Sequence, residues 1–264
     1  MDLIKSIFAS RKLRLPPNAL ILENPKDTDA FAEEIFGAAG DYANKPSKDW
    51  RPFYPTHEIQ SYGDCVTFSY LNCLETMAKA ANIPDDDGNE LNLSDLYLAV
   101  KAGTTQNGNS FNNVCEIAKK EGIVLEKECP YTYNWNERSI IVSKVPSSAK
   151  RYMKGTGHAW VQINRNSMKS ALERGPIQIG VGLGDTYSMG GVITPPSSIQ
   201  VYHAMMCSYI DDKDQLYCYD HYNRQEIILS GNYKVEFIKQ LVPNGLPNGW
   251  QTATGDDHKM WQSL

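Results

Sequence analysis

The sequence has few of the features that mark nucleic-acid-binding proteins. Lys and Arg number 26 against 31 Asp and Glu, and the formal net charge is −5, whereas binding to a phosphate backbone needs a clustered positive field. The one basic cluster, at residues 11–14, is short, and we interpret it as a solvated N-terminal face. We therefore expect no nucleic-acid partner.

Long apolar runs and dense cysteine patterns are also missing. No stretch approaches the roughly 20 apolar residues that span a bilayer, and the apolar run near the N-terminus is too short for a secretory signal. Six cysteines are too few for a disulfide framework, and no Cys-x-x-Cys or His-Glu-x-x-His pattern gives metal spacing. These absences predict a soluble protein with no signal peptide, no membrane partner and no metal or organic cofactor. They favour reduced thiols, in a reducing environment or an assembled particle.

The first half of the chain has helical patterns. Residues 28–39 predict a short amphipathic helix with Asp27 or Thr28 as its cap. A longer helix is predicted from Cys65 to about residue 81, where Asn-Ile-Pro stops it, because apolar residues recur at helical spacing. Two more helices are expected at 94–101 and 112–120.

After Pro146 the pattern changes to short segments rich in β-branched and aromatic residues, separated by turn formers. This half is predicted to be antiparallel β structure. If Asp211–Asp214 closes a hairpin, Cys207 and Cys218 become directly opposed, and packed free thiols are favoured over a strained disulfide. The closing residues lack periodicity and predict a wrapped loop or tail.

Cys65 falls at the start of its predicted helix, where the partial positive charge and free N–H groups favour an anion such as a thiolate. A thiol nucleophile also needs an imidazole to take the proton, a third group to orient that imidazole, and donors for an oxyanion. His203 lies 138 residues after Cys65, within the spacing of roughly 130–150 that one cysteine peptidase family shows. His158 is a rival base, but it lies earlier in the chain, before the Gly-Pro-Ile segment.

The order of motifs resembles the papain and cathepsin family of cysteine peptidases from Asp49 to about Val242, as a divergent member. The matching segments, in chain order, are Asp-Trp-Arg at 49–51, the segment from Gln60 to Ser69, Leu-Ser-Asp-x-x-Leu at 93–98, Asn-Gly-Asn at 107–109, Gly-Ile-x-x-Glu-x-x-Cys-Pro-Tyr at 122–131, Gly-Pro-Ile at 175–177, Tyr-x-x-x-Gly-Val at 187–192, Tyr-His-Ala at 202–204 and Tyr-Asp-His-Tyr at 219–222.

The resemblance implies a two-lobed α+β fold. After an N-terminal extension (1–47), it implies a helical lobe (48–145), then an antiparallel β-barrel-like lobe (146–242) and a C-terminal tail (243–264). The extension lacks the helical pattern of an inhibitory propeptide, and we expect it to pack on the surface or on a partner instead of filling the cleft between the lobes. A protein partner is expected to bind through 1–47 or 243–264, besides a polypeptide substrate in the cleft between the lobes.

The resemblance also implies the site residues. Cys65 is the nucleophile, His203 the general base and Asp220 the group that orients it. Gln60 and the Cys65 backbone N–H form the oxyanion hole. The implied substrate-binding residues are Asn107, Gly108, Asn109 and Gly191. The reaction is then peptide-bond hydrolysis through an acyl-thioester.

Some residues depart from the family pattern. Asp220 replaces an Asn, a change that imidazole orientation tolerates. Gln60 precedes Cys65 by one position fewer than usual, Asp64 adds a negative charge that opposes thiolate formation, and Val66 replaces a Trp. These departures motivate an alternative, a weak or inactive pseudo-protease that serves as a structural or assembly component, for example of a virus particle. Transpeptidation or deamidation by the same thioester chemistry is a further alternative.

Overall fold

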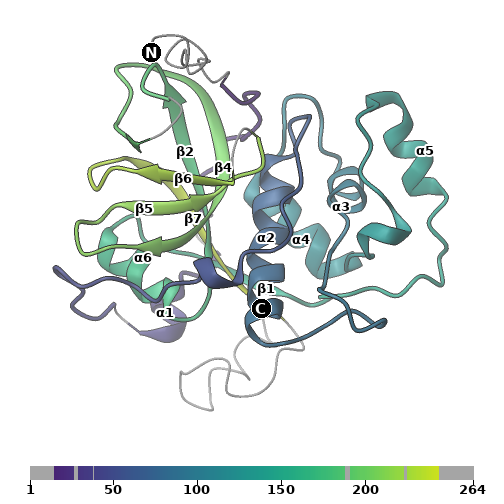
Figure 1. The fold of residues 1–264 in the computed structure, drawn as a ribbon, viewed down its shortest axis with the longest axis horizontal. Helices are drawn as coiled ribbons and strands as arrows, with labels where there is room; N and C mark the ends of the chain where they lie inside the picture. Colours follow the sequence, from purple (N-terminus) through teal and green to yellow (C-terminus); the bar gives the residue numbers. More distant parts are fainter. Residues whose placement is uncertain (1–14, 27–28, 38, 188–190, 223–224, 244–264) are drawn as a thin grey trace, which may run out of the picture.

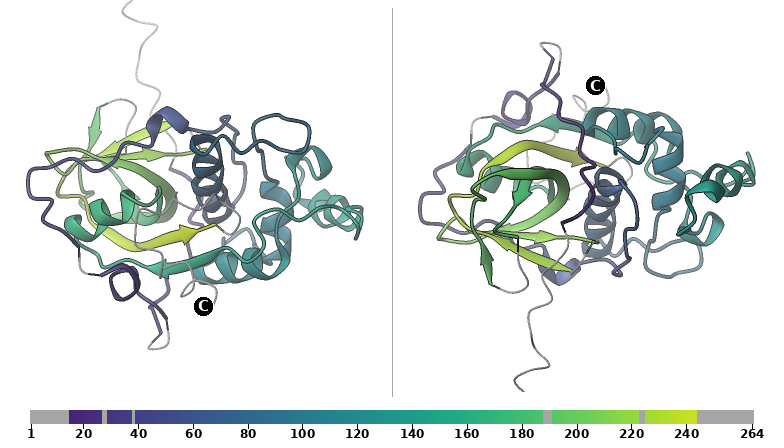
Figure 2. Two further views of the ribbon diagram at one scale, coloured as in Figure 1. Left: turned by 90° about the horizontal axis from the view of Figure 1, so that it is seen from below. Right: turned by 90° about the horizontal axis from the view of Figure 1, so that it is seen from above.

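The computed structural model describes residues 15–26, 29–37, 39–187, 191–222 and 225–243, and its longest helix, α2 (Cys65–Ala80), lies between the sheet and the helices that follow it between residues 95 and 143 (Figures 1 and 2). Every residue of α2 from Cys65 to Ala78 is buried, because one face contacts β4 and other faces contact α3 and α4. The predicted helix is confirmed, and its polar residues, too, are enclosed by protein.

The remaining helices of this side are α3 (Asp95–Lys101), α4 (Phe111–Glu121) and α5 (Arg138–Ser143), with 3-10 turns η1 (Arg51–Phe53), η2 (Glu126–Glu128) and η3 (Trp135–Glu137). Both helices predicted for this region are confirmed, and their ends follow local chemistry. Ser94 and Ser110 accept hydrogen bonds from the backbone N–H groups of Tyr97 and Asn113, which are otherwise unpaired at a helix start. α4 ends at Gly122, whose φ of 68° suits glycine.

The second half of the chain forms a curled seven-stranded sheet, with α6 (Arg165–Leu172) packed against it (Figures 1 and 2). The strands are β1 (Gly157–Trp160), β2 (Ile177–Gly184), β3 (Val192–Ile193), β4 (Ile199–Ile210), β5 (Leu216–Tyr219), β6 (Glu226–Leu229) and β7 (Val235–Val242). Their order is β1-β7-β2-β4-β5-β6-β3, and the pairs are antiparallel except β3 with β6. The α+β fold is confirmed, but the sheet keeps two edge strands and is open, so the expected barrel-like closure is not found.

The β4–β5 hairpin confirms one local prediction. Cys207 and Cys218 are directly opposed in its register, and both are buried free thiols.

The described residues of the N-terminal extension are mostly irregular and contact both halves of the molecule. Its helix α1 (Ala32–Phe36) is shorter than predicted, and the predicted caps at 27 and 28 lie outside the described residues. Isolated bridges pair Leu20 with Asn109 on the helical side and Phe31 with Trp160 on the sheet side. The predicted tail also lies almost wholly outside the described residues. Among the residues that the structure describes, no helix has both the length and the apolar character to cross a membrane.

Candidate active site

Cys65 is the first residue of α2 and faces the sheet lobe from the helical side. Its side chain is buried, and the preceding residue, Asp64, makes no side-chain cap bond to the helix. The first N–H groups of α2 are therefore not capped by that side chain, and they supply partial positive charge where a thiolate would form. The helix start was predicted from the sequence, and the structure places Cys65 there.

His203 and Asp220 come from neighbouring strands of the sheet. His203 lies within β4 and Asp220 directly follows β5, and the antiparallel pairing of these strands brings the two side chains together. The His203 Nε2 and Asp220 Oδ1 atoms are 2.7 Å apart, and both side chains are buried. Two residues 17 positions apart thus form one ion-paired unit.

Burial and charge act in opposite directions on this pair. Burial alone would lower the pKa of His203. The charge of the Asp220 carboxylate and its hydrogen bond raise this pKa by more than burial lowers it, and the Cys65 thiol adds to the rise, so the pKa lies above its usual value. Burial raises the pKa of Asp220, yet the charge and hydrogen bond of His203 hold it below its usual value. The ionised form of the pair, imidazolium with carboxylate, is therefore favoured.

The second ring nitrogen of His203, Nδ1, is the one available to Cys65. It is buried and has no hydrogen-bond partner among the described residues, while Cys65 lies close enough to the ring to raise its pKa. With Nε2 committed to Asp220, a proton from the thiol can pass only to Nδ1. The structure thus brings Cys65, His203 and Asp220 together in that order.

Two further histidines lie behind Asp220. His57 Nε2 is 3.1 Å from the Asp220 backbone oxygen, and its ring stacks on His221 with centroids 5.3 Å apart. His221 is buried, its Nδ1 donates to the Glu58 carbonyl at 2.6 Å, and its Nε2 accepts from the Asn72 side chain. Burial lowers the pKa of His221 to about 4, so its ring is a neutral support for the segment that follows β5.

Gln60, the predicted oxyanion donor, is buried in the loop before α2. Its side-chain Nε2 donates to the Tyr62 carbonyl at 2.5 Å, and its backbone N–H donates to the His221 carbonyl at 2.9 Å. One amide N–H is thus used within its own loop, and the other is the one that remains for an oxyanion.

Residues 18–21 of the extension lie across the predicted substrate-binding region. The Asn109 backbone N–H donates to the Ala19 carbonyl at 3.1 Å, and the Ile21 N–H donates to the Asn109 carbonyl at 3.0 Å. On the sheet side, the N–H groups of Ala19 and Leu20 both lie 3.3 Å from the carbonyl oxygen of Tyr202, the residue before His203. Ala19 and Leu20 are buried as a result.

Glycines make this close approach possible. A Cβ at Gly108 would lie 1.5 Å from the Ala19 carbonyl oxygen, and the φ of Gly108 is +87°, so glycine is required there. A Cβ at Gly63, two residues before Cys65, would lie 3.1 Å from the Ala19 Cβ. A Cβ at Gly180 would lie 2.6 Å from a Leu20 methyl group. Ala19 therefore lies beside the nucleophile loop, and Leu20 fills the space over β2.

The expectation that the extension avoids the cleft is wrong for this segment. The segment is held by backbone hydrogen bonds and by the buried side chains of Ala19 and Leu20. The expectation depended on the absence of a helical pattern, but these contacts do not require a helix. Of the predicted substrate-binding residues, Gly108 and Asn109 contact the segment directly, whereas Asn107 is exposed. Gly191 is exposed at the edge strand β3, and the structure gives it no contact with the segment.

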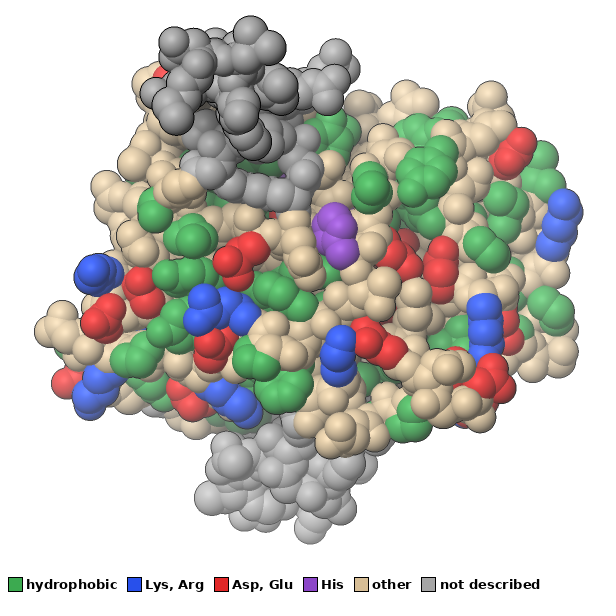
Figure 3. Space-filling model, in the orientation of Figure 1, with side chains coloured by type: hydrophobic (Ala, Val, Ile, Leu, Met, Phe, Trp, Pro, Cys, Tyr) green, Lys and Arg blue, Asp and Glu red, His purple; other side chains and the backbone are tan. Residues whose placement is uncertain are grey.

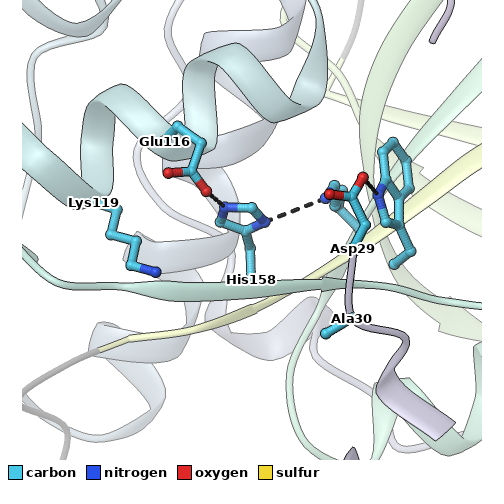
Figure 4. Close-up of a pocket in the computed structure, with 7 residues that line it drawn as sticks. Asp29, Ala30, Glu116, Lys119 and His158 are labelled. Carbon is cyan, nitrogen blue, oxygen red and sulfur yellow. Dashed lines mark hydrogen bonds and ion pairs between the residues drawn. The ribbon is translucent and has the colours of Figure 1, made fainter. Parts of the chain in front are cut away.

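His158, the rival base, belongs to a different pocket. Its Nε2 is 2.7 Å from the Glu116 carboxylate and its Nδ1 is 3.2 Å from the Lys239 ammonium, and the pocket also contains Asp29 and Lys119 (Figure 4). Asp29 accepts from the Trp160 indole at 2.8 Å, so this cluster anchors the extension to the sheet. His158 lies on β1, at the opposite side of β7 and β2 from β4, and it is not part of the site around Cys65.

The visible surface of the molecule carries charges of both signs, interspersed with polar and apolar side chains (Figure 3). Among the described residues, no group of three or more His, Cys, Asp and Glu side chains is placed to hold a metal ion.

The chain belongs to the papain family of cysteine proteases: the family model described as "Papain family cysteine protease" matches residues 45–219. Cys65, His203 and Gln60 lie within the matched range, and Asp220 follows directly after it. A comparison with curated proteins found no match.

Solved structures of similar fold agree with this membership. Xylellain, a cysteine protease from Xylella fastidiosa, is 13% identical with a TM-score of 0.63, covering 88% of this chain and 97% of its own. Bromelain from Ananas comosus in complex with the E64 inhibitor is 19% identical, with a TM-score of 0.55 and coverages of 75% and 99%. Digestive procathepsin L 3 of Tenebrio molitor is 14% identical, with a TM-score of 0.59 and coverages of 88% and 75%. At these identities the comparisons establish the fold.

Proposed function

We propose that this protein is a thiol peptidase that hydrolyses peptide bonds through an acyl-thioester on Cys65. The observation that supports this most strongly is the buried His203–Asp220 ion pair at 2.7 Å, with the free Nδ1 of its imidazole adjacent to a cysteine at a helix N-terminus. A merely structural histidine has no need of a buried carboxylate on one side and a thiol on the other.

The chemistry follows from that arrangement. The Cys65 proton passes to His203 Nδ1, and the thiolate attacks the carbonyl carbon of the peptide. The oxyanion is stabilised by the Cys65 backbone N–H and the Gln60 amide. His203 returns the proton to the leaving amine, and a thioester remains. Water then attacks the thioester with His203 as base, releasing the acid and the thiol.

In the conformation described here the enzyme is closed to substrate. Ala19 and Leu20 occupy the backbone positions between Asn109 and Tyr202 that a bound peptide would need. The proposal therefore includes a requirement that this segment leave before turnover. The apolar environment of Leu20 favours a peptide with an apolar side chain at the same place.

The test uses the full chain with Ala19→Arg, because the Ala19 side chain is fully buried beside Gly63 and a long charged group cannot fit there. We expect at least a tenfold rise in the cleavage rate of a fluorogenic peptide with an apolar side chain, and a similar rise in labelling by an epoxide thiol probe. Ile21→Arg is the matched control, since Ile21 is 48% exposed, and it should leave both rates unchanged.

Cys65→Ala in the Ala19→Arg background should abolish cleavage and labelling at this position. Labelling of Cys65 without any cleavage across a peptide library would favour the pseudo-protease alternative. Labelling no faster than that of an unfolded control would reject the proposed chemistry altogether.

A further inference from the structure

Asp64, the residue before the nucleophile, carries a carboxylate that is fully buried. One of its oxygens accepts a hydrogen bond from Arg138 Nη2 at 2.7 Å, and the other accepts from the Tyr131 hydroxyl at 2.7 Å. Arg138 is itself buried, with its side chain 4% exposed. The negative charge beside Cys65 is therefore compensated within the helical lobe.

The segment that supplies these partners also holds the rest of the loop. The Tyr131 hydroxyl accepts from the Ser61 backbone N–H at 3.3 Å, and the Tyr62 hydroxyl donates to the Tyr133 carbonyl. The Arg138 guanidinium lies 4.5 Å from the centre of the Trp135 ring, and that ring meets Tyr62 edge to face at 5.1 Å. We call Tyr131, Trp135 and Arg138 the loop clamp.

The loop clamp contacts the loop between Gln60, the proposed oxyanion donor, and Cys65, the proposed nucleophile. Ser61, Tyr62 and Asp64 each bind it, and they lie between Gln60 and Cys65. No disulfide supports this loop, since all six cysteines are free. The position of the oxyanion donors relative to the sulfur therefore depends on contacts with residues 131–138.

A buried ion pair is a poor source of stability, because removing two charges from water offsets most of their attraction. Its position directly before the proposed nucleophile points to a use other than stability. From the sheet lobe, His203 interacts with Cys65, and Asp220 is bonded to the other ring nitrogen of His203. On the helical side, the charged residue next to Cys65 in the chain is Asp64, whose carboxylate is paired with Arg138. Without Arg138, the site would carry an uncompensated second carboxylate.

We propose that Arg138 and Tyr131 are positioning residues for the nucleophile, which fix the loop 60–64 and neutralise Asp64 so that Cys65 ionises against His203 alone. This inference rests on the proposed role of Cys65. Arg138 acts through Asp64 and does not touch the reacting atoms.

The test compares Arg138→Met, Asp64→Asn and the double variant in the full chain. The readout is the pH midpoint of Cys65 ionisation, followed by thiolate ultraviolet absorbance as the difference from the same chain with Cys65→Ala. This readout does not require an open cleft. Arg138→Met exposes the thiol to an unpaired carboxylate and should raise the midpoint by about one pH unit, with about a tenfold loss of alkylation at neutral pH.

Asp64→Asn leaves an unpaired guanidinium and should move the midpoint in the opposite direction, and the double variant should return it close to that of the unaltered protein. Arg165→Met is the matched control. Arg165 is a half-buried arginine bonded to the Gly231 and Tyr233 carbonyls in the sheet lobe, so it should lower thermal stability and leave the midpoint unchanged. Arg138→Lys keeps the charge and serves if Arg138→Met does not fold; it should keep the midpoint.

Equal midpoints of Cys65 ionisation in all variants would overturn the proposed role of Arg138 and Tyr131. The same conclusion would follow if the midpoints of all variants shifted in one direction in proportion to their loss of thermal stability. A failure of this proposal can be distinguished from a failure of the proposed peptidase function. A His203→Ala variant with an unchanged midpoint would reject the activated pair, while opposite shifts in Arg138→Met and Asp64→Asn would still establish the charge compensation.

Discussion

Asp220 in the sheet lobe and three carboxyl groups in the helical lobe, those of Glu75, Asp95 and Glu126, are largely enclosed by protein, and their pKa values are shifted in opposite directions. In the sheet lobe, burial raises the pKa of Asp220, but the imidazolium of His203 lowers it by a larger amount, so the pKa of Asp220 lies below its usual value. In the helical lobe, burial raises the pKa of Glu75, Asp95 and Glu126, and neighbouring carboxylates such as Glu58 raise it again. Burial is common to both lobes, so the sign of the nearest charge decides which form is stable.

The two lobes also differ in how they prepare the site. The sheet lobe places His203 on β4 and Asp220 directly after the neighbouring strand β5, and the hydrogen bonds that pair the two strands fix their separation. The helical lobe presents the sulfur from a helix start, where the loop before it is fixed by side chains far along the chain. Changes to His203 or Asp220 should therefore alter the chemistry directly, whereas changes to the residues of the helical lobe that fix the loop before Cys65 should alter ionisation and stability.

The largest effect is expected from His203→Ala, which removes the base. The cleavage rate in the Ala19→Arg background should fall by about a thousandfold, within the range for loss of a general acid–base group. His158→Ala is the control, because His158 is bonded to Glu116 and Lys239 in another pocket. Comparable losses in both variants, measured as kcat/KM, would show that His203 has no special role.

The next largest effect on the cleavage rate is expected from changes to Asp220, the carboxylate bonded to His203 in the sheet lobe. Asp220→Ala should lower the rate by about one to two orders of magnitude, while Asp220→Asn should lose less, because an amide oxygen still accepts from His203 Nε2–H. The Asp220 charge raises the pKa of His203. Its removal should therefore lower that pKa, and the upper limb of the alkylation profile should move to lower pH. An unmoved limb in Asp220→Asn would show that Asp220 does not set the charge of the imidazole.

The sequence predicted those parts of the structure that have local or ordered signals. The α2 start at Cys65, the helix expected at 94–101 and the opposed Cys207 and Cys218 follow from helical spacing and hairpin register. The order of motifs pointed to His203 and Asp220, which the structure pairs. Domain boundaries and catalytic roles stay predictions.

Other contacts had no signal that sequence reasoning could use. Arg138 is 74 residues from Asp64 and lies in a short helix that was not predicted, so only the fold brings the two together. Ala19 and Leu20 bind mainly through backbone groups, which every sequence has. The glycines at 63 and 108 were the available hint, because each leaves space beside the site that another chain can fill.

The smallest effect is expected from Glu126 in the helical lobe, and it concerns how the free energy of unfolding depends on pH. The pKa of Glu126 is raised to about 8, mainly by burial and then by Glu58, so the folded state binds a proton that the unfolded state has lost above about pH 4.5. The resulting stabilisation is complete below the unfolded value and disappears as the pH rises through about 8. Between those values the free energy of unfolding should fall with rising pH, opposite to the contribution of Asp220, which is lost at acid pH.

Glu126→Gln keeps the side-chain oxygen that accepts from the Tyr131 N–H at 2.5 Å and removes the titration. It should raise the free energy of unfolding by roughly 2 to 4 kcal/mol at pH 8 and by less than about 1 kcal/mol at pH 5, as measured by urea denaturation at the two pH values. Glu128→Gln, at an exposed position in the same 3-10 turn, is the matched control and should change stability equally little at both. If Glu126→Gln shows the same difference from the unaltered protein at pH 5 and pH 8, Glu126 is already ionised in the folded state. The like-charge account of the helical lobe would then be wrong, and the opposition between the two lobes would reduce to the His203–Asp220 pair.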